Sequence, residues 1–217
     1  MMFDKIFPKI HQEGYKFLAI SVILTLILWS FSNFFGFIFI LITIWVYYFF
    51  RDPERTIIED DNYLVSPADG LITTIKEEMG PIEMGLEKKN FIKVSIFMNV
   101  FDCHVNRTPF SGKIEDIFYK PGKFLNASLD KASEENERNY FKIKDNKTAE
   151  CIVVVQIAGL IARRIVTHVE KKQTVNQGQR IGMIRFGSRV DVYYKERKTM
   201  VKVGQNVIAG ESLIASS

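Results

Sequence analysis

The sequence predicts a mainly β fold: a barrel-sandwich-like β domain with hairpin repeats, preceded by an N-terminal hydrophobic helical hairpin. Three observations support this. Residues 17–50 contain no Asp, Glu, Lys or Arg. The rest of the chain alternates short apolar runs with Gly-bearing turns, as strands do. A nine-residue motif also occurs twice near the C-terminus. We therefore expect a membrane-associated segment over residues 1–50 and a β domain over residues 51–217.

The apolar segment is interrupted near its middle. Crossing a hydrocarbon core takes roughly 20 apolar residues, and neither Phe17–Trp29 nor Phe34–Phe50 clearly exceeds that length. Two geometries follow, a pair of short helices in a hairpin or one long tilted span. Lysines precede the segment and arginines follow it, and positive charge at both ends favours the hairpin with both ends in the cytoplasm. We expect attachment to the inner cell membrane, with the β domain facing the cytoplasm, and no cleaved signal peptide.

Composition argues against nucleic acid as a partner and against a bound metal. The net charge of +4 includes no block of Lys and Arg, and no nucleic-acid motif occurs, so nucleic acid is not an expected partner. Cys103 and Cys151 lie far apart and form no metal-ligand spacing. We expect free thiols, a reducing compartment and no bound metal.

Several strands can be placed from local patterns. Alternation over Phe91–Val100 predicts a half-buried strand, and the continuous apolar run Cys151–Ala158 predicts a strand buried on both faces. Further strands are expected over Ile165–Val169, Arg189–Tyr194 and Thr199–Val203. Many short strands with Gly turns favour a barrel or a sandwich.

The repeated motif reads Val-x-x-Gly-x-x-(Ile/Leu). It occurs in Thr174–Gly182 and again in Asn206–Ile214. Each copy predicts a strand, a tight turn at Gly and a second strand, although chance similarity of two Gly turns is an alternative. The copies lie on either side of a Gly187-Ser188 step, so we expect that step between structured strands.

The Gly187-Ser188 step carries possible chemistry. A serine in a strained turn can attack the preceding carbonyl with its own hydroxyl, which converts the amide into an ester, and β-elimination then breaks the chain. The dehydroalanine that remains hydrolyses to a pyruvoyl group, an electrophilic ketone. A plain turn is the alternative, because Gly-Ser is a common turn dipeptide.

Two other polar residues are candidate catalytic groups. Asp69 lies at the apex of the turn Ser66–Gly70, where an Asx turn is the structural alternative. His104 follows a predicted strand among polar residues, where a structural histidine is the alternative.

The residues together resemble the short bacterial and archaeal type of phosphatidylserine decarboxylase proenzyme, a pyruvoyl-dependent family. The resemblance covers almost the whole chain, and six motifs in one order make it highly specific. These are Phe49–Arg55, Ser66–Gly70, Asn99–Pro109, Glu135–Asn139, Gln156–Ile165 and Gly182–Arg189.

The resemblance implies cleavage between Gly187 and Ser188 into a β chain (1–187) and an α chain (188–217) that stay associated. It implies that His104 removes the proton of the Ser188 hydroxyl and that Asp69 orients His104. Ser188 then becomes the pyruvoyl cofactor, with no metal and no pyridoxal phosphate. The amine of phosphatidylserine would form a Schiff base with it, lose CO2 and leave as phosphatidylethanolamine.

The sequence departs from the family pattern at one position. The resemblance also does not say which residues bind the lipid headgroup. Longer family members carry a second histidine where this chain has Arg107, so His104 is the one histidine available in this segment. We expect a homo-oligomer of αβ units. Four arginines are candidates for binding the lipid phosphate or carboxylate, with ordinary surface charge as the alternative: Arg51, Arg55, Arg163 and Arg164.

Two other functions compete with this one. A membrane-tethered biotinyl- or lipoyl-like carrier or adaptor would explain the apolar segment and the repeated turns, but neither turn has a Lys at its apex. A pyruvoyl enzyme acting on a soluble amino acid would not need the apolar segment.

Overall fold

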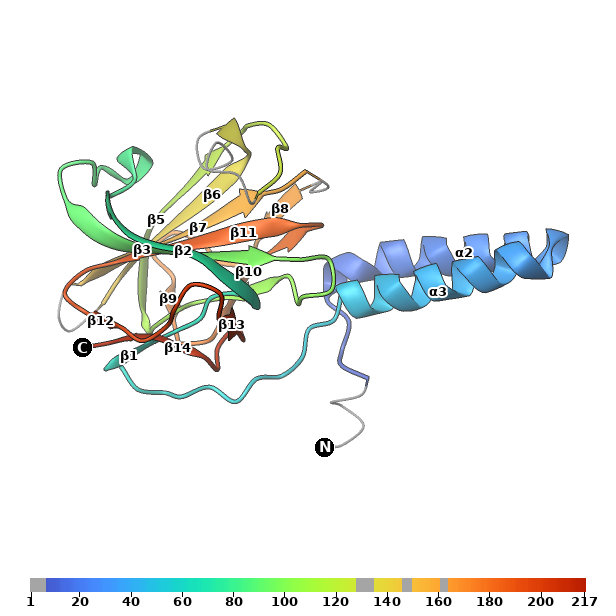
Figure 1. Cartoon of the computed structure of the whole chain (residues 1–217), viewed down its shortest axis with the longest axis horizontal. Coiled ribbons are helices and arrows are strands. Elements are labelled where there is room, and N and C mark those ends of the chain that lie inside the picture. The colour runs from blue at the N-terminus through green and yellow to red at the C-terminus, as the bar shows by residue number, and fades with distance from the viewer. Residues whose placement is uncertain (1–6, 128–134, 146–149, 161–163) are drawn as a thin grey trace. The chain divides into compact units, whose positions relative to one another are not determined.

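A computed structural model describes residues 7–127, 135–145, 150–160 and 164–217 (Figure 1). The chain divides into two compact units, Met1–Glu54 and Arg55–Ser217. The division falls in the charged segment that follows the apolar residues.

The first unit is a helical hairpin. A 3-10 turn η1 (Gln12–Gly14) leads into α2 (Tyr15–Phe31), and α3 (Asn33–Phe49) follows. Ser32, between the helices, has extended backbone (φ −163°, ψ 131°), which ends one helix and begins the next. This break lies inside the interruption expected from the sequence, and it excludes the single long span.

Polar contacts join the two helices and the residues that flank them. At the open end the His11 N–H donates to the Phe50 carbonyl at 2.8 Å, and farther along the Thr25 and Thr43 hydroxyl oxygens are 2.9 Å apart. The helices are therefore antiparallel, as Figure 1 shows. By length and composition the 20-residue helical stretch Gln12–Phe31 can cross a membrane, and α3 is shorter.

The second unit consists of strands in three sheets. The eight-stranded sheet has the order β13-β2-β3-β11-β7-β6-β5-β9, and the smaller sheets have the orders β4-β10-β8 and β1-β14-β12. Neighbouring strands are antiparallel throughout. The bounds are β1 (Tyr63–Val65), β2 (Gly70–Met79), β3 (Asn90–Met98), β4 (Val105–Arg107), β5 (Gly112–Lys120), β6 (Arg138–Lys144), β7 (Cys151–Ala158), β8 (Arg164–Thr167), β9 (Thr174–Val175), β10 (Arg180–Arg185), β11 (Ser188–Tyr194), β12 (Lys198–Thr199), β13 (Asn206–Val207) and β14 (Leu213–Ser216).

The large sheet is curled (Figure 1), and it has a hydrophobic core on each face. Its inner face packs against residues of both small sheets, such as Ile184 of β10 and Ile214 of β14. Its outer face packs against the segment around the 3-10 turn η2 (Ile82–Met84), with Leu86 and Tyr193 in that cluster. Strand alternation assigns the residues of β11 to these two faces in turn. The mainly β class expected from the sequence is confirmed.

The two motif copies have the same arrangement in the sheets. In each copy the first strand (β9 or β13) forms an edge of the large sheet, and the second (β10 or β14) is the centre of a small sheet. Pairing within each copy is therefore absent, and the expected local hairpins are wrong. The turn residues Gly178 and Gly210 both have left-handed backbone and both lie against Ile57. The repeat thus links the large sheet to each small sheet.

Local patterns place some strands well and others poorly. The run Cys151–Ala158 matches β7, and β3 and β11 lie within a residue or two of their expected bounds. The strand expected over Thr199–Val203 is wrong, because β12 ends at Thr199 and the chain turns at Gly204 to reach β13.

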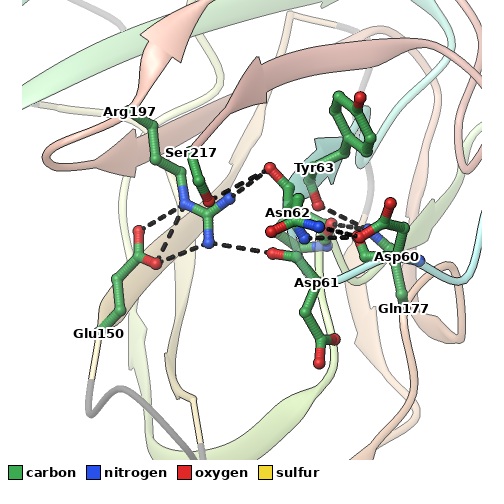
Figure 2. A network of polar contacts seen from close by, with 9 residues as sticks. Asp60, Asp61, Asn62, Tyr63, Glu150, Gln177, Arg197 and Ser217 are labelled. Carbon is green, nitrogen blue, oxygen red and sulfur yellow. Dashed lines mark hydrogen bonds and ion pairs between the residues drawn. The ribbon is translucent and has the colours of Figure 1, made fainter.

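A polar network ties the C-terminal part of the chain to the rest (Figure 2). The Arg197 guanidinium donates to both carboxylate oxygens of Glu150 at 2.7–3.0 Å. It also donates to the carbonyls of Asn62 at 3.0 Å and Asp61 at 3.2 Å. The Arg197 side chain is only 6% exposed. These residues line an open cleft of about 1170 Å³, whose lining does not include Ser188, His104 or Asp69.

Glu150→Ala leaves the buried Arg197 charge without its carboxylate. Removing one partner of a buried ion pair costs about 3 kcal/mol, and we expect that loss in the free energy of unfolding, measured by urea and circular dichroism. The control is Glu135→Ala, which breaks the exposed Lys123–Glu135 pair and costs less than about 1 kcal/mol. Equal losses in the two variants would contradict this role of the network.

Candidate active site

The Gly187-Ser188 step lies at a sharp corner between two sheets. β10 ends at Arg185 in a small sheet, and β11 begins at Ser188 in the large one. Phe186 (φ 67°) and Gly187 (φ 52°) both have left-handed backbone. For a residue with a side chain this conformation costs about 1–2 kcal/mol. Phe186 therefore stores strain immediately before the Gly-Ser peptide.

Ser188 is buried at the start of a central strand. It lies opposite Met98 of β3 and Ala158 of β7, and alternation puts its side chain on the same face as Val190. The residue is 0% exposed, and its Oγ has no hydrogen-bond partner in the part of the chain that the structure describes. Burying an unsatisfied hydroxyl costs about 1–3 kcal/mol. Such a group, next to a strained carbonyl, is available for reaction.

His104 is fully buried at the same end of the sheet. Its carbonyl accepts a hydrogen bond from the Ile184 N–H of β10 at 3.3 Å, and β10 leads to the corner. The ring Nδ1 is 3.0 Å from the Asp102 carbonyl oxygen. Because a carbonyl only accepts, Nδ1 carries the proton in this bond, which leaves the lone pair on Nε2 in the neutral form of the ring. The ring is thus set up to act as a base through Nε2.

Asp69 forms a buried ion pair with a candidate arginine. Its Oδ2 accepts from Arg55 Nη2 at 2.7 Å, and its Oδ1 accepts from the Ala209 N–H at 2.8 Å. In the described part of the chain, neither oxygen bonds to His104. The next residue, Gly70, lies against the Phe97 carbonyl of β3, one residue before the partner of Ser188. Asp69 therefore lies at the end of the sheet that holds Ser188, and its orienting role stays a prediction.

Arg107, at the position of the second family histidine, connects the two repeated turns. Its Nη1 donates to the Gly178 carbonyl at 2.9 Å, and its Cδ lies against Gly210. The Arg107 side chain is buried, so it contributes to packing between the two motif copies.

The other arginine candidates lie in different surroundings. Arg51 belongs to the first unit, where its guanidinium stacks 3.8 Å from the Tyr48 ring centroid. Arg164 is exposed at the start of β8. Burial raises the pKa of nearby Tyr119, and the Arg164 charge opposes that shift. Arg163 lies outside the described residues.

A buried chain of polar side chains, to which sequence reasoning assigned no role, crosses between the sheets. Gln156 Nε2 of β7 donates to Asn106 Oδ1 of β4 at 2.8 Å, and Asn139 of β6 donates to Gln156 Oε1 at 3.2 Å and to Thr167 Oγ1 at 3.0 Å. The available signal was a glutamine inside the otherwise apolar run Cys151–Ala158. These bonds fix the small sheet that carries β4 and β10 against the large one.

Arg189, next to Ser188, is held on the opposite face of β11. Its Nε and Nη2 donate to the two carboxylate oxygens of Asp191 at 2.9 and 3.1 Å. Its Nη1 donates to the Ala127 carbonyl at 3.1 Å. Arg189 therefore joins the start of β11 to the backbone at Ala127.

Comparison with known proteins decides the family. The family model for phosphatidylserine decarboxylase matches residues 42–215. The chain belongs to the phosphatidylserine decarboxylase family. It is 65% identical over 214 residues to a phosphatidylserine decarboxylase proenzyme of Pelagibacter ubique, covering 99% of both chains. It is 47% identical to that of Ruegeria pomeroyi over 99% of this chain and 98% of the relative. It is 50% identical to that of Azorhizobium caulinodans over 95% and 88%.

Family membership makes the chain an enzyme, a decarboxylase, and rules out the carrier without catalysis. The matched region contains Asp69, His104 and Ser188. Among the residues that the structure describes, His, Cys, Asp and Glu form no group of three that could hold a metal ion.

Gly187→Ala tests how much the corner depends on glycine at this position. A Cβ at Gly187 would have nothing within 4 Å, so the left-handed torsion alone should lower the free energy of unfolding, by about 1 kcal/mol. The measurement is urea unfolding, made in a Ser188→Ala background so that the Ser188 hydroxyl plays no part. Gly85→Ala is the matched control, because Gly85 also has positive φ (66°) and open space. A loss above about 3 kcal/mol at Gly187 alone would contradict the open corner.

Proposed function

We propose that this decarboxylase is a self-cleaving precursor. It breaks its own Gly187–Ser188 bond, converts Ser188 into a pyruvoyl group, and decarboxylates phosphatidylserine to phosphatidylethanolamine. The observation that carries the proposal is the buried Ser188 hydroxyl, which has no partner in the described part of the chain and follows a strained corner. The relatives are named proenzymes, which supports a precursor processed into a catalytic form.

The cleavage uses atoms already in the chain. Ser188 Oγ attacks the Gly187 carbonyl carbon, the C–N bond breaks, and the hydroxyl proton ends on the Ser188 nitrogen, leaving an ester. Removal of the Ser188 Hα then breaks the Cβ–Oγ bond, which releases the Gly187 carboxylate and leaves dehydroalanine. Water converts that residue to pyruvoyl and releases ammonia. His104 Nε2 takes the hydroxyl proton in the first step.

The fold supports retention of the cleaved fragment. Within residues 188–217, β11 pairs with β3 and β7, β13 pairs with β2, and β14 pairs with β1. The Arg197–Glu150 pair adds an ionic contact between the two fragments. Loss of one peptide bond removes none of these contacts.

The pyruvoyl carbonyl supplies an electrophile for the substrate amine and an electron sink for loss of CO2. His104, fully buried at the same end of the sheet, is the residue we propose to return a proton to carbon. Arg55 is already paired with Asp69, so exposed Arg164 is the better candidate for the lipid phosphate. The hairpin would hold the enzyme at the inner membrane, facing the cytoplasm, where its lipid substrate lies. We propose a homo-oligomer of αβ units.

Ser188→Ala removes the nucleophile and the cofactor together. We expect no fragment 188–217 on denaturing electrophoresis and no CO2 release from carboxyl-labelled phosphatidylserine in detergent. Ser95→Ala is the matched control, because Ser95 is a buried serine in β3 of the same sheet. The control should be cleaved and active. Cleavage or activity in Ser188→Ala would overturn the proposal.

A further inference from the structure

We infer that Gly159 is a positioning residue for self-cleavage, an inference that rests on the proposed function. Gly159 directly follows β7 and faces the corner. A Cβ at this position would lie 2.2 Å from the Gly187 carbonyl oxygen and 2.9 Å from its carbon. Both distances are shorter than real Cβ contacts. The carbonyl that Ser188 would attack therefore occupies the space of the missing side chain.

Space, and not backbone conformation, explains glycine at this position. The described glycines with positive φ include Gly70, Gly187 and Gly210, but not Gly159. Its backbone is therefore one that ordinary residues adopt. Alanine at Gly159 would be opposed chiefly by the contact with the Gly187 backbone, which is the shortest that its Cβ would make.

Ala158, the residue before Gly159, is held through both of its backbone polar groups. The Ala158 N–H donates to the Glu137 carbonyl at 2.9 Å, and the Ala158 carbonyl accepts from Asn136 Nδ2 at 2.6 Å. Asn136 is 0% exposed, and Ala127 closes the far side, with its Cβ 3.3 Å from the added Cβ position. Gly159 therefore cannot retreat easily from the carbonyl that it contacts.

A methyl group at Gly159 would have to move the scissile carbonyl. Ser188 pairs with Ala158 in the ladder between β11 and β7, so these two strands resist moving apart. The Gly187–Ser188 peptide group would therefore rotate to relieve the clash. Misplacing reacting atoms by about 1 Å can cost roughly 100-fold in rate. Gly159 thus sets the angle at which Ser188 Oγ meets the Gly187 carbon.

The test is Gly159→Ala in the full chain, with cleavage followed over time by denaturing electrophoresis. We expect fragment 188–217 to appear roughly 100-fold more slowly than in the wild type. Hydroxylamine cleaves esters and leaves amides intact, so it reports whether the first step has occurred. Intact Gly159→Ala precursor should resist hydroxylamine, because its block precedes the ester.

Gly112→Ala is the matched control. Its Cβ would lie 2.5 Å from the Lys144 carbonyl oxygen, a similar clash in β5, again without positive φ. This variant should be cleaved at the wild-type rate. A folded Gly159→Ala precursor that is cleaved within about twofold of the wild type would overturn the inference. A wild-type chain that is never cleaved would instead overturn the proposed function.

Asn136→Asp keeps the inference testable if Gly159→Ala does not fold. Folding of both variants is measured by circular dichroism in a Ser188→Ala background, where cleavage plays no part. Aspartate keeps the size of Asn136 but loses the amide that donates to the Ala158 carbonyl, so the support of Gly159 loosens. We expect cleavage at least about tenfold slower, and cleavage at the wild-type rate would overturn the inference.

Discussion

Pairing of β11 along both of its edges is the constraint on which the rest of the site depends. Because β3 and β7 hold the strand on either side, Ser188 cannot shift along the sheet or leave the core. The strain at Phe186 is therefore confined to the corner just before the strand. The same two ladders retain the fragment that begins at Ser188, so one feature both strains the proposed cleavage site and preserves the fold afterwards.

The corner also depends on how the two sheets meet. The bonds from Asn106 to Gln156 and on to Asn139 cross from the small sheet to the large one, and they fix the distance that the corner has to span. His104 lies two residues before Asn106 in the sequence, so the proposed base is fixed by the same polar chain. Satisfied buried polar groups of this kind favour one arrangement of the core over its alternatives.

Local pattern is sufficient for features that depend on burial alone. It predicts the helix break near Ser32, the strand β7 and the Gly187-Ser188 step between structured segments. It does not predict partners, because pairing joins residues far apart in sequence. The motif copies look like hairpins, yet their strands pair elsewhere. Ser188 and His104 are identifiable through the family motifs, whereas the Asp69–Arg55 pair and the contact of Gly159 with Gly187 exist only in three dimensions.

The account depends on the chemical fate of Ser188, and mass spectrometry of the small fragment measures it directly. The account predicts a fragment that begins at residue 188 and is lighter than the serine-terminated peptide by the mass of ammonia, with a terminus blocked to Edman degradation. A fragment of unmodified mass with a free serine terminus, or a chain that stays intact in active enzyme, would contradict it.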